Sequence, residues 1–315
     1  MVVGSFNVDH AWRAPMLPRP GETLAGSYAS GPGGKGFNQA VAAVRSGAPT
    51  SFVCALGTDA GGELARTLAN AEGIELHAAP ASAPTGTAGI FVDADGRNSI
   101  VIGAGANALL DRAFVEARVG AAAVVLVQLE SPLDAVLAAL QAGRARGATT
   151  ILNPAPAPVL DRSARDALLA AVDVLTPNES EFARLLPGDG TAPPAEAVAT
   201  MDDASLHALC RRLLPAGTVV VTLGAEGAFV SHPADNRRGD DRDCYRIPAE
   251  RVSPVDTTGA GDAFNGALAA AMAAGGPFSG LVRFAGRFAA VSTEHPGAAL
   301  SMPLLAEVEG RFGGL

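Results

Sequence analysis

The chain has 315 residues, of which 48% are hydrophobic and 17% charged, and its formal net charge is −9 at pH 7. A chain of this length and apolar content can bury a large core, so we expect one large α/β domain with room for a smaller appendage. The negative charge and the lack of a basic block argue against general nucleic-acid binding, although local backbone dipoles can still hold the phosphates of a nucleotide.

The cysteines and the first residues bear on the compartment and on membranes. Cys54, Cys210 and Cys244 form no C-x-x-C pair, which favours reduced thiols in a cytoplasmic protein over a zinc or redox site. The chain does not open on a basic region followed by an apolar run. No window reaches the roughly 18 consecutive apolar residues of a membrane span, so we expect no membrane partner.

The first segment predicts a buried strand over residues 1–3 that ends in a loop holding Asn7 and Asp9. These two polar residues are candidates for ligand binding, although Asn and Asp also make local turn bonds to the backbone. Residues 10–32 contain four prolines and are typical of short, exposed strands.

A glycine-rich turn at residues 31–38 then precedes a predicted helix over residues 39–45. It is not a phosphate loop, because Gly36 follows Lys35 where that motif requires Ser or Thr. The turn suits close backbone approach to a small polar ligand, with Lys35 and Asn38 as hydrogen-bonding groups, or it is only a tight connection into the helix.

The middle of the chain alternates between strand and helix patterns. A strand is predicted over residues 51–56 and a helix over 61–70, followed by two strand-like runs around the turn signal Asp95-Gly96. A hairpin inside a β-α chain suggests a small sheet set apart from the main one. We expect the excursions at about 10–32 and 85–103 to form one β-sheet lid.

The second half predicts further strands that end in polar residues. The strand patterns cover 122–129 (apolar except for Gln128), 149–152, 172–175 and 219–223, and a helix is predicted over 133–144. Asn178 with Glu181 three residues later fits a helix N-cap with a capping box. The segments 187–204 and 231–246 are predicted to be a surface loop and an exposed hairpin tip or loop.

The segment Asp256-Thr257-Thr258-Gly259-Ala260-Gly261-Asp262 runs directly into an Ala-rich helix pattern. Backbone N–H groups at such a helix start have no intrahelical partner and favour an anion. A carboxylate at position 262 would repel that anion. Its presence there is explained if it takes a proton from a group that attacks the anion. The alternative is that Asp262 only complements the helix dipole.

Together these patterns predict a doubly wound, mostly parallel α/β sheet flanked by helices, with a small β-sheet lid, in a single domain over residues 1–315. Ligands of such sheets bind at the carboxyl ends of the strands. That rule brings together Asn7, Asp9, Glu130, Asn178, Thr222 and the segment 256–262.

Two of these motifs carry a resemblance to a known family. Gly33-Gly34-Lys35-Gly36-Phe37-Asn38-Gln39-Ala40 and the segment 256–262, with further matches at 4–9, 128–132, 152–156 and 176–179, resemble the ribokinase-like (phosphofructokinase-B type) carbohydrate kinases over essentially the whole chain. The resemblance implies transfer of the γ-phosphoryl group of ATP to a sugar hydroxyl, namely O5 of D-ribose in the ribose-phosphorylating members. It also implies Mg²⁺ as a cofactor.

The resemblance also implies roles for individual residues. Asp262 matches the catalytic base, and Gly259, Ala260 and Gly261 match the anion hole. The sugar-binding positions are matched by Asn7, Asp9, Gly34, Lys35, Asn38, Glu130 and Asp262. The nucleotide-binding positions are matched by Asn178, Glu181, Thr222, Leu223, Gly224, Ala225, Glu226, Gly227, Gly261 and Gly286, with Glu181 linked to magnesium.

Family members also bind an activating monovalent cation, usually K⁺, and commonly form homodimers through their lids. The cation positions are matched by Asp256, Thr258, Ser292, His295, Gly297 and Ser301, although His295 and Pro296 depart from the pattern. An exposed sheet also has edges that need covering, so we expect a homodimer.

Other functions remain open at this point. A kinase for deoxyribose, fructose or a nucleoside would use the same chemistry, but a nucleoside needs an apolar base pocket and the lid region has few aromatics. A non-catalytic sugar or nucleotide sensor is a further alternative, which the intact Asp262 motif argues against. A nicotinamide dehydrogenase is excluded because the full G-x-G-x-x-G is absent.

Overall fold

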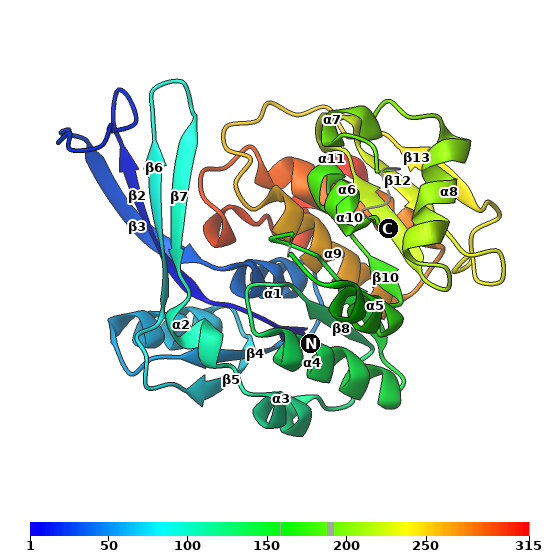
Figure 1. Cartoon of the computed structure of the whole chain (residues 1–315), viewed down its shortest axis with the longest axis horizontal. Helices are drawn as coiled ribbons and strands as arrows, with labels where there is room; N and C mark the ends of the chain where they lie inside the picture. The colour runs from blue at the N-terminus through cyan, green and yellow to red at the C-terminus, as the bar shows by residue number, and fades with distance from the viewer. Residues whose placement is uncertain (158, 188–191, 315) are drawn as a thin grey trace.

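The computed structural model describes residues 1–157, 159–187 and 192–314, and is built around one large sheet (Figure 1). The strand order is β13-β12-β11-β10-β9-β8-β1-β4-β5. Its strands are β1 (Val2–Val3), β4 (Ser51–Leu56), β5 (Glu75–Pro80), β8 (Val124–Val127), β9 (Thr149–Leu152), β10 (Val174–Leu175), β11 (Thr218–Thr222), β12 (Ala228–Ser231) and β13 (Cys244–Ile247). Neighbouring strands from β5 to β11 pair in parallel, whereas β12 pairs antiparallel with both β11 and β13.

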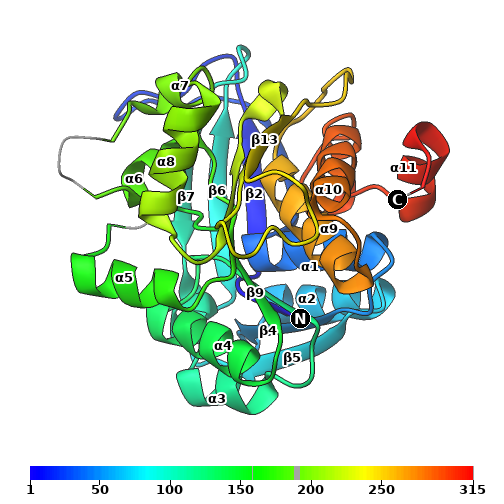
Figure 2. The ribbon, with the colours of Figure 1, turned by 90° about the vertical axis from the view of Figure 1, so that its right-hand side faces the viewer.

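Helices cover both faces of this sheet, as the turned view shows (Figure 2). One hydrophobic core holds α1 (Lys35–Arg45), α2 (Ala60–Ala71), α9 (Ala260–Ala274), α10 (Phe278–Ser292) and α11 (Leu305–Phe312) against one face. A second core holds α3 (Arg112–Arg118), α4 (Leu133–Ala145), α5 (Arg162–Ala170), α6 (Glu179–Leu185), α7 (Ala195–Val198) and α8 (Asp203–Leu213) against the other. The predicted doubly wound sheet is therefore confirmed. None of the helices in the described part of the chain has the length and apolar character to cross a membrane.

A separate four-stranded sheet, which we call the small sheet, stands beside the large one (Figure 1). Its order is β3-β2-β6-β7, with β2 (Asn7–Arg13), β3 (Ser27–Gly33), β6 (Gly86–Val92) and β7 (Asn98–Gly103). The two central strands pair in parallel, and each pairs antiparallel with an edge strand. A short helix, η1 (Gly105–Leu109), returns the chain to the large sheet.

Some predicted boundaries were wrong. Asn7 and Asp9 lie in β2 rather than in a loop, because ladders to both neighbouring strands satisfy their backbone groups and outweigh the local turn tendency. The helix predicted over 39–45 begins at Lys35. The segment 187–204, of which residues 188–191 lie outside the described part, contains α7 and the start of α8 rather than a loop alone. The hairpin predicted around 231–246 is confirmed by the pairing of β12 with β13.

Helices α1 and α9 pack closely where the two glycine-rich motifs meet. Gly266 is the contact point, because a Cβ there would lie 2.4 Å from the Gln39 carbonyl oxygen and 2.5 Å from the Ala42 Cβ. Both of these groups belong to the regular structure of α1, so they cannot move aside separately. The close approach lets the first turn of α9 meet the first turns of α1.

We expect Gly266→Ala to lower the free energy of unfolding by about 1–3 kcal/mol despite the better helix propensity of alanine, because the added methyl overpacks the contact with α1. Urea denaturation measures the change. The matched control is Gly280→Ala in α10, where nothing lies within 4 Å of the new Cβ and stability should rise by up to about 1 kcal/mol. A Gly266→Ala protein as stable as the unmodified one would contradict this packing.

Candidate active site

Asp262 lies in the first turn of α9 and is 5% exposed. Gly259 precedes the helix as its N-cap with a φ of 77°, a left-handed conformation that glycine adopts without strain. Both carboxylate oxygens of Asp262 accept hydrogen bonds from α1: Oδ2 from the Asn38 Nδ2 at 2.9 Å, and Oδ1 from the Gln39 Nε2 at 2.9 Å. The side chain is therefore held by two neutral amides rather than by a cation in direct contact.

The predicted anion hole, formed by Gly259, Ala260 and Gly261, lies directly before this carboxylate in the chain. Gly261 is exposed, and nothing lies within 4 Å of where its Cβ would be, so a ligand has room to approach its backbone. The Ala260 N–H donates to the Thr257 carbonyl over 3.2 Å. An anion bound by this group would have to replace that long turn bond.

Charged side chains gather around Asp262. The pKa of Lys35 is raised above its ordinary value by the Asp262 carboxylate first and then by Glu130 and Glu181, against the opposing effect of burial. Burial raises the pKa of Asp9 to about 6, with further contributions from Glu130 and Asp262. These groups, from β2, α1, α6, α9 and the segment after β8, therefore share one electrostatic environment.

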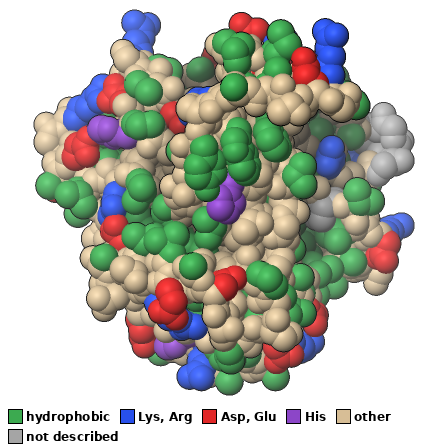
Figure 3. All heavy atoms as spheres, turned by 90° about the vertical axis from the view of Figure 1, so that its left-hand side faces the viewer, with side chains coloured by type: hydrophobic (Ala, Val, Ile, Leu, Met, Phe, Trp, Pro, Cys, Tyr) green, Lys and Arg blue, Asp and Glu red, His purple; other side chains and the backbone are tan. Residues whose placement is uncertain are grey.

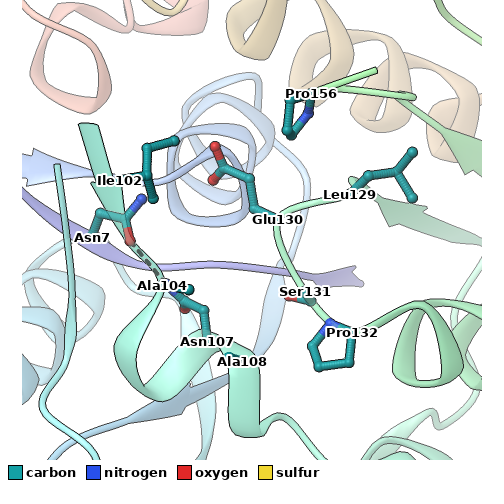
Figure 4. Close-up of a pocket in the computed structure, with 10 residues that line it drawn as sticks. All are labelled: Asn7, Ile102, Ala104, Asn107, Ala108, Leu129, Glu130, Ser131, Pro132 and Pro156. Carbon is teal, nitrogen blue, oxygen red and sulfur yellow. Dashed lines mark hydrogen bonds between the residues drawn. The ribbon is translucent and has the colours of Figure 1, made fainter. Parts of the chain in front are cut away.

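A cavity of about 300 Å³ opens beside this cluster (Figure 4). It is lined by Asn7 from β2, Ile102 from β7, Glu130 after β8 and Pro156 after β9. The small sheet and the carboxyl ends of the large sheet thus contribute to the same cavity. Of the residues predicted to meet at this edge, Asn7 and Glu130 line the cavity.

The cavity walls hold several polar side chains in fixed orientations. Asn7 accepts a hydrogen bond at Oδ1 from the Asn107 Nδ2 at 2.8 Å, which leaves its own amide hydrogens free to donate. Glu130 accepts at Oε2 from the Ser5 hydroxyl at 2.5 Å and from the Lys35 backbone N–H at 3.0 Å. Its Oε1 can serve as an acceptor for a ligand.

Asn38 provides an unpaired group. Its Nδ2 donates to Asp262, but its buried Oδ1 has no hydrogen-bond partner in the described structure. An unpaired buried acceptor is costly, and a hydroxyl donor would satisfy it. Gly34, the N-cap of α1, accepts the backbone N–H of Asn38 at its carbonyl oxygen over 3.0 Å.

The predicted nucleotide residues lie along neighbouring strand ends. Asn178, the N-cap of α6, forms a parallel bridge with Thr222 at the end of β11. The chain then continues through Leu223 into η2 (Gly224–Glu226) and the turn at Gly227. Leu223 is buried, whereas Gly224, Ala225 and Glu226 are exposed. Gly286 lies on α10, a separate element, and nothing is within 4 Å of its Cβ position.

Glu181 is the residue on this side that suits a divalent cation. It is 8% exposed, and one oxygen, Oε2, accepts the Asn178 backbone N–H at 2.9 Å as part of the predicted capping box. Burial raises the pKa of Glu181. Mg²⁺ prefers oxygen ligands and retains several waters, so one buried carboxylate and the substrate phosphates fit it. Within the described residues, no group of three or more His, Cys, Asp or Glu side chains is arranged to hold a metal ion by itself.

The predicted monovalent-cation residues are only partly brought together. Asp256 accepts from the Thr258 N–H at Oδ1 (2.9 Å) and from the Gly297 N–H at Oδ2 (3.0 Å). Burial alone would raise the pKa of Asp256, but these hydrogen bonds hold it below its ordinary value. The ring of His295 is directed elsewhere, with its Nε2 3.3 Å from Glu307.

The two serines predicted at the cation site use their hydroxyls locally. Ser292 donates to the Ala289 carbonyl at 2.8 Å and Ser301 to the Ala298 carbonyl at 2.7 Å. A hard cation takes oxygen ligands, and the carboxylate of Asp256 is of that type.

Several residues that support the site were missed by the sequence analysis. Gln39 holds Asp262, and Asn107 fixes Asn7 and brackets the Phe6 backbone through its Oδ1 and Nδ2, each at 3.0 Å. Ser5 holds Glu130. Gln39 and Ser5 lie in segments that carry the family resemblance, but no role was predicted for them because their contacts join segments far apart in the chain.

Comparisons with known proteins agree with this architecture. The ribokinase of Haemophilus influenzae is 39% identical over 311 residues, which cover 96% of this chain and 94% of that protein. The crystal structure of ribokinase from Thermotoga maritima superposes with a TM-score of 0.83 at 31% identity, covering 98% of this chain and 97% of that one.

A ribokinase from Arabidopsis thaliana, solved in complex with ribose and ATP, superposes with a TM-score of 0.77 at 31% identity, covering 98% of this chain and 96% of that one. The description of the pfkB family of carbohydrate kinases matches residues 1–305. The match spans both glycine-rich motifs and nearly every element of the fold. The chain belongs to the pfkB family of carbohydrate kinases.

Proposed function

We propose that this protein is an ATP-dependent kinase that transfers the γ-phosphoryl group to O5 of D-ribose, giving D-ribose 5-phosphate and ADP. The observation that supports this most directly is a buried carboxylate, Asp262, held by two amides of α1 at the start of α9, where the backbone of Gly261 is exposed. The similarity to ribokinases, including one solved with ribose and ATP, favours these substrates.

In this proposal Asp262 is the general base. It takes the proton from O5 as the new O5–phosphorus bond forms and the bond from phosphorus to the ADP oxygen breaks. The N–H groups of Gly259, Ala260 and Gly261 stabilise the charge that develops on the transferred group. Lys35 lies among the carboxylates and offsets their mutual repulsion.

We assign sugar binding to the polar side chains around the cavity. Asn7 donates from its free amide hydrogens, whereas Asp9, Glu130 and the unpaired Oδ1 of Asn38 accept from sugar hydroxyls. Lys35 donates, and Gly34 allows the sugar to approach the backbone. A site of paired donors and acceptors rejects an analogue that lacks a hydroxyl, because buried polar groups are then left without a partner.

We assign nucleotide binding to Asn178 and the segment from Thr222 to Gly227, with Gly286 contributing from α10. Glu181 would hold Mg²⁺ through water or directly. When bound, this ion neutralises phosphate charge during transfer. The exposed backbone of Gly224, Ala225 and Glu226 leaves one side of the nucleotide open to solvent.

The small sheet acts as a lid in this proposal. Ile102 of β7 lines the cavity together with Asn7 and Glu130, so this sheet covers the sugar side (Figure 4). An apolar cover excludes water, which would otherwise compete with O5 as the acceptor.

We propose that two copies associate through their small sheets. Trp12 stacks on Phe91 with ring centroids 5.3 Å apart and packs against Tyr28 at 5.3 Å, and these rings lie on the face opposite Asp9. Trp12, Tyr28 and Val101 are 38%, 54% and 69% exposed, and Figure 3 shows hydrophobic side chains gathered on this side. A large exposed apolar face favours association. A monomeric mass by light scattering at assay concentration would refute the dimer.

The function is tested by an ADP-release assay on ribose, deoxyribose, fructose and a nucleoside with ATP and Mg²⁺, in K⁺ and in Na⁺. We expect the highest kcat/KM on ribose and a faster rate in K⁺, since the Asp256 carboxylate, held by the Thr258 and Gly297 N–H groups, supplies oxygen ligands. Binding of ribose and ATP without turnover would indicate a sensor. Turnover on another sugar but not on ribose would overturn the assigned substrate.

Asp262→Asn should lower kcat by about 10²–10⁴-fold, the range that a general base contributes, while ribose and ATP still bind. Steady-state kinetics and calorimetric titration measure the two effects. The control is Asp202→Asn at the N-cap of α8, where asparagine caps equally well and kcat should not change. Unchanged turnover in Asp262→Asn would contradict the mechanism.

Asp9→Asn should raise the KM for ribose and also stabilise the protein at pH 8. The folded pKa of Asp9 is about 6 against an ordinary 3.8, so the folded state loses stability as pH rises from 3.8 to about 6, and the penalty is fully present above that pH. The separation corresponds to a gain of about 1–3 kcal/mol in the variant, after allowance for solvent screening. Urea denaturation should show this gain at pH 8 and much less at pH 4. An equal gain at both values would contradict the assigned burial.

A further inference from the structure

A buried chain of amide and hydroxyl groups, which we call the amide network, connects Asp262 to the strands of the large sheet. Its members are Gln39, Gln128, Asn153, Thr176 and Asn265, all at most 6% exposed. The proposed reaction gives none of them a contact with sugar or nucleotide. Buried polar groups are costly when they lack hydrogen-bond partners, so their arrangement calls for a physical account.

Gln39 is the branch point of the network. Its Nε2 donates to Asp262 Oδ1 at 2.9 Å and to Asn153 Oδ1 at 3.1 Å, which uses both amide hydrogens. Its Oε1 accepts from the Gln128 Nε2 at 2.5 Å. An ionised carboxylate can only accept, so the amide of Gln39 cannot turn around without placing two acceptors against each other.

Gln128 and Gly4 set this orientation from the other side. The Gln128 Oε1 has no hydrogen-bond partner in the described structure and lies 2.0 Å from the position that a Cβ on Gly4 would occupy. The gap left by Gly4 therefore accommodates the Gln128 carbonyl group. With that group in place, the Nε2 of Gln128 faces Gln39.

The network returns to the same helix start by a second route. Asn153 donates from Nδ2 to the Thr176 carbonyl at 3.1 Å, and the Thr176 hydroxyl donates to Asn265 Oδ1 at 2.5 Å. Asn265 in turn donates to the Gly261 carbonyl at 2.8 Å. Both the carboxylate of Asp262 and the backbone of Gly261 are thus tied to β9 and β10.

We propose that Gln39 is the positioning residue of the active site: it fixes the Asp262 carboxylate toward the sugar cavity and ties the base to the predicted anion hole through the amide network. Asn38 holds the other oxygen but also faces the sugar, so only Gln39 is dedicated to orientation. This inference rests on the proposed role of Asp262 as the base.

The charged groups around Asp262 determine how the proposal is tested. Lys35 on α1, Asp9 on β2, Glu130 after β8 and Glu181 on α6 all act on this region, and none of them hydrogen-bonds to Gln39 in the described structure. Changing Gln39 therefore removes a hydrogen bond from Asp262 and leaves these charges in place. Loss of an N–H donor to an ionised carboxylate favours its protonation, so the acid limb of the kcat profile should move to higher pH.

The experiment compares Gln39→Leu and the nearly isosteric Gln39→Glu with the unmodified protein on ribose and ATP. We expect kcat to fall at least 10-fold with KM for ATP changed less than 3-fold. The acid limb of the kcat–pH profile should move to higher pH by about one unit in Gln39→Leu. It should move further in Gln39→Glu, where a second carboxyl group faces Asp262. The matched control is Thr150→Val, which removes buried hydrogen bonds on β9 to Ala171 and Asp173 and should lower stability without moving the limb.

The outcomes are distinguishable. An unmodified protein without turnover on any sugar refutes the proposed function before Gln39 is reached. If the unmodified protein is active, folded Gln39 variants with unchanged kcat overturn the positioning role. Variants with lower kcat but an unmoved acid limb overturn it as well. As with Thr150→Val, the acid limb would then not respond to the lost hydrogen bonds. Should Gln39→Leu fail to fold, the comparison rests on Gln39→Glu, which preserves side-chain volume.

Discussion

The buried carboxylate of Asp262 is the constraint on which the rest of the site depends. A carboxylate that is 5% exposed is costly unless hydrogen bonds and nearby positive charge compensate it. Here two amides from the first turns of α1 supply hydrogen bonds, and Lys35 supplies the charge. These groups reach Asp262 only because Gly266 lets α1 and α9 approach closely. The two glycine-rich motifs are thus two halves of one structure.

The distribution of charges in the site also explains how a chain of net charge −9 could bind the negatively charged phosphates of ATP. In the proposed function, Asp9, Glu130 and Asp262 would give the sugar side an excess of acceptors, which suits an uncharged ligand rich in hydroxyl donors. In the proposed function, the nucleotide side would rely instead on exposed backbone at Gly261 and along η2, together with a cation held by Glu181. The proposed sugar side thus offers negatively charged acceptors, whereas the proposed nucleotide side offers exposed backbone and a cation, and Lys35 lies between them.

Much of the fold follows from patterns within single segments of the sequence. The alternation of apolar runs with helix patterns predicted the parallel sheet, and the capping box at Asn178 and Glu181 is confirmed. Strand limits were less predictable: the run over 122–129 yields only Val124–Val127, because pairing with β1 and β9 decides where the ladder ends.

Contacts between distant segments were not predictable in the same way. Gln39 lies 223 residues from Asp262 and 89 from Gln128, and no local pattern links them. Only the break that Gln128 makes in an apolar strand hinted at a polar partner inside the core. Likewise Asn107 and Asn7 are 100 residues apart, and their hydrogen bond depends on how η1 returns from the small sheet. Side-chain orientation at the site is therefore a property of the tertiary packing.

The most direct test of the account is a crystal structure of the protein with ribose and a non-hydrolysable ATP analogue. We predict that ribose occupies the cavity beside Asn7 and Glu130, with its O5 within hydrogen-bond distance of the Asp262 carboxylate and in line with the terminal phosphate. Ribose bound outside this cavity, or with O5 turned away from Asp262, would contradict the account.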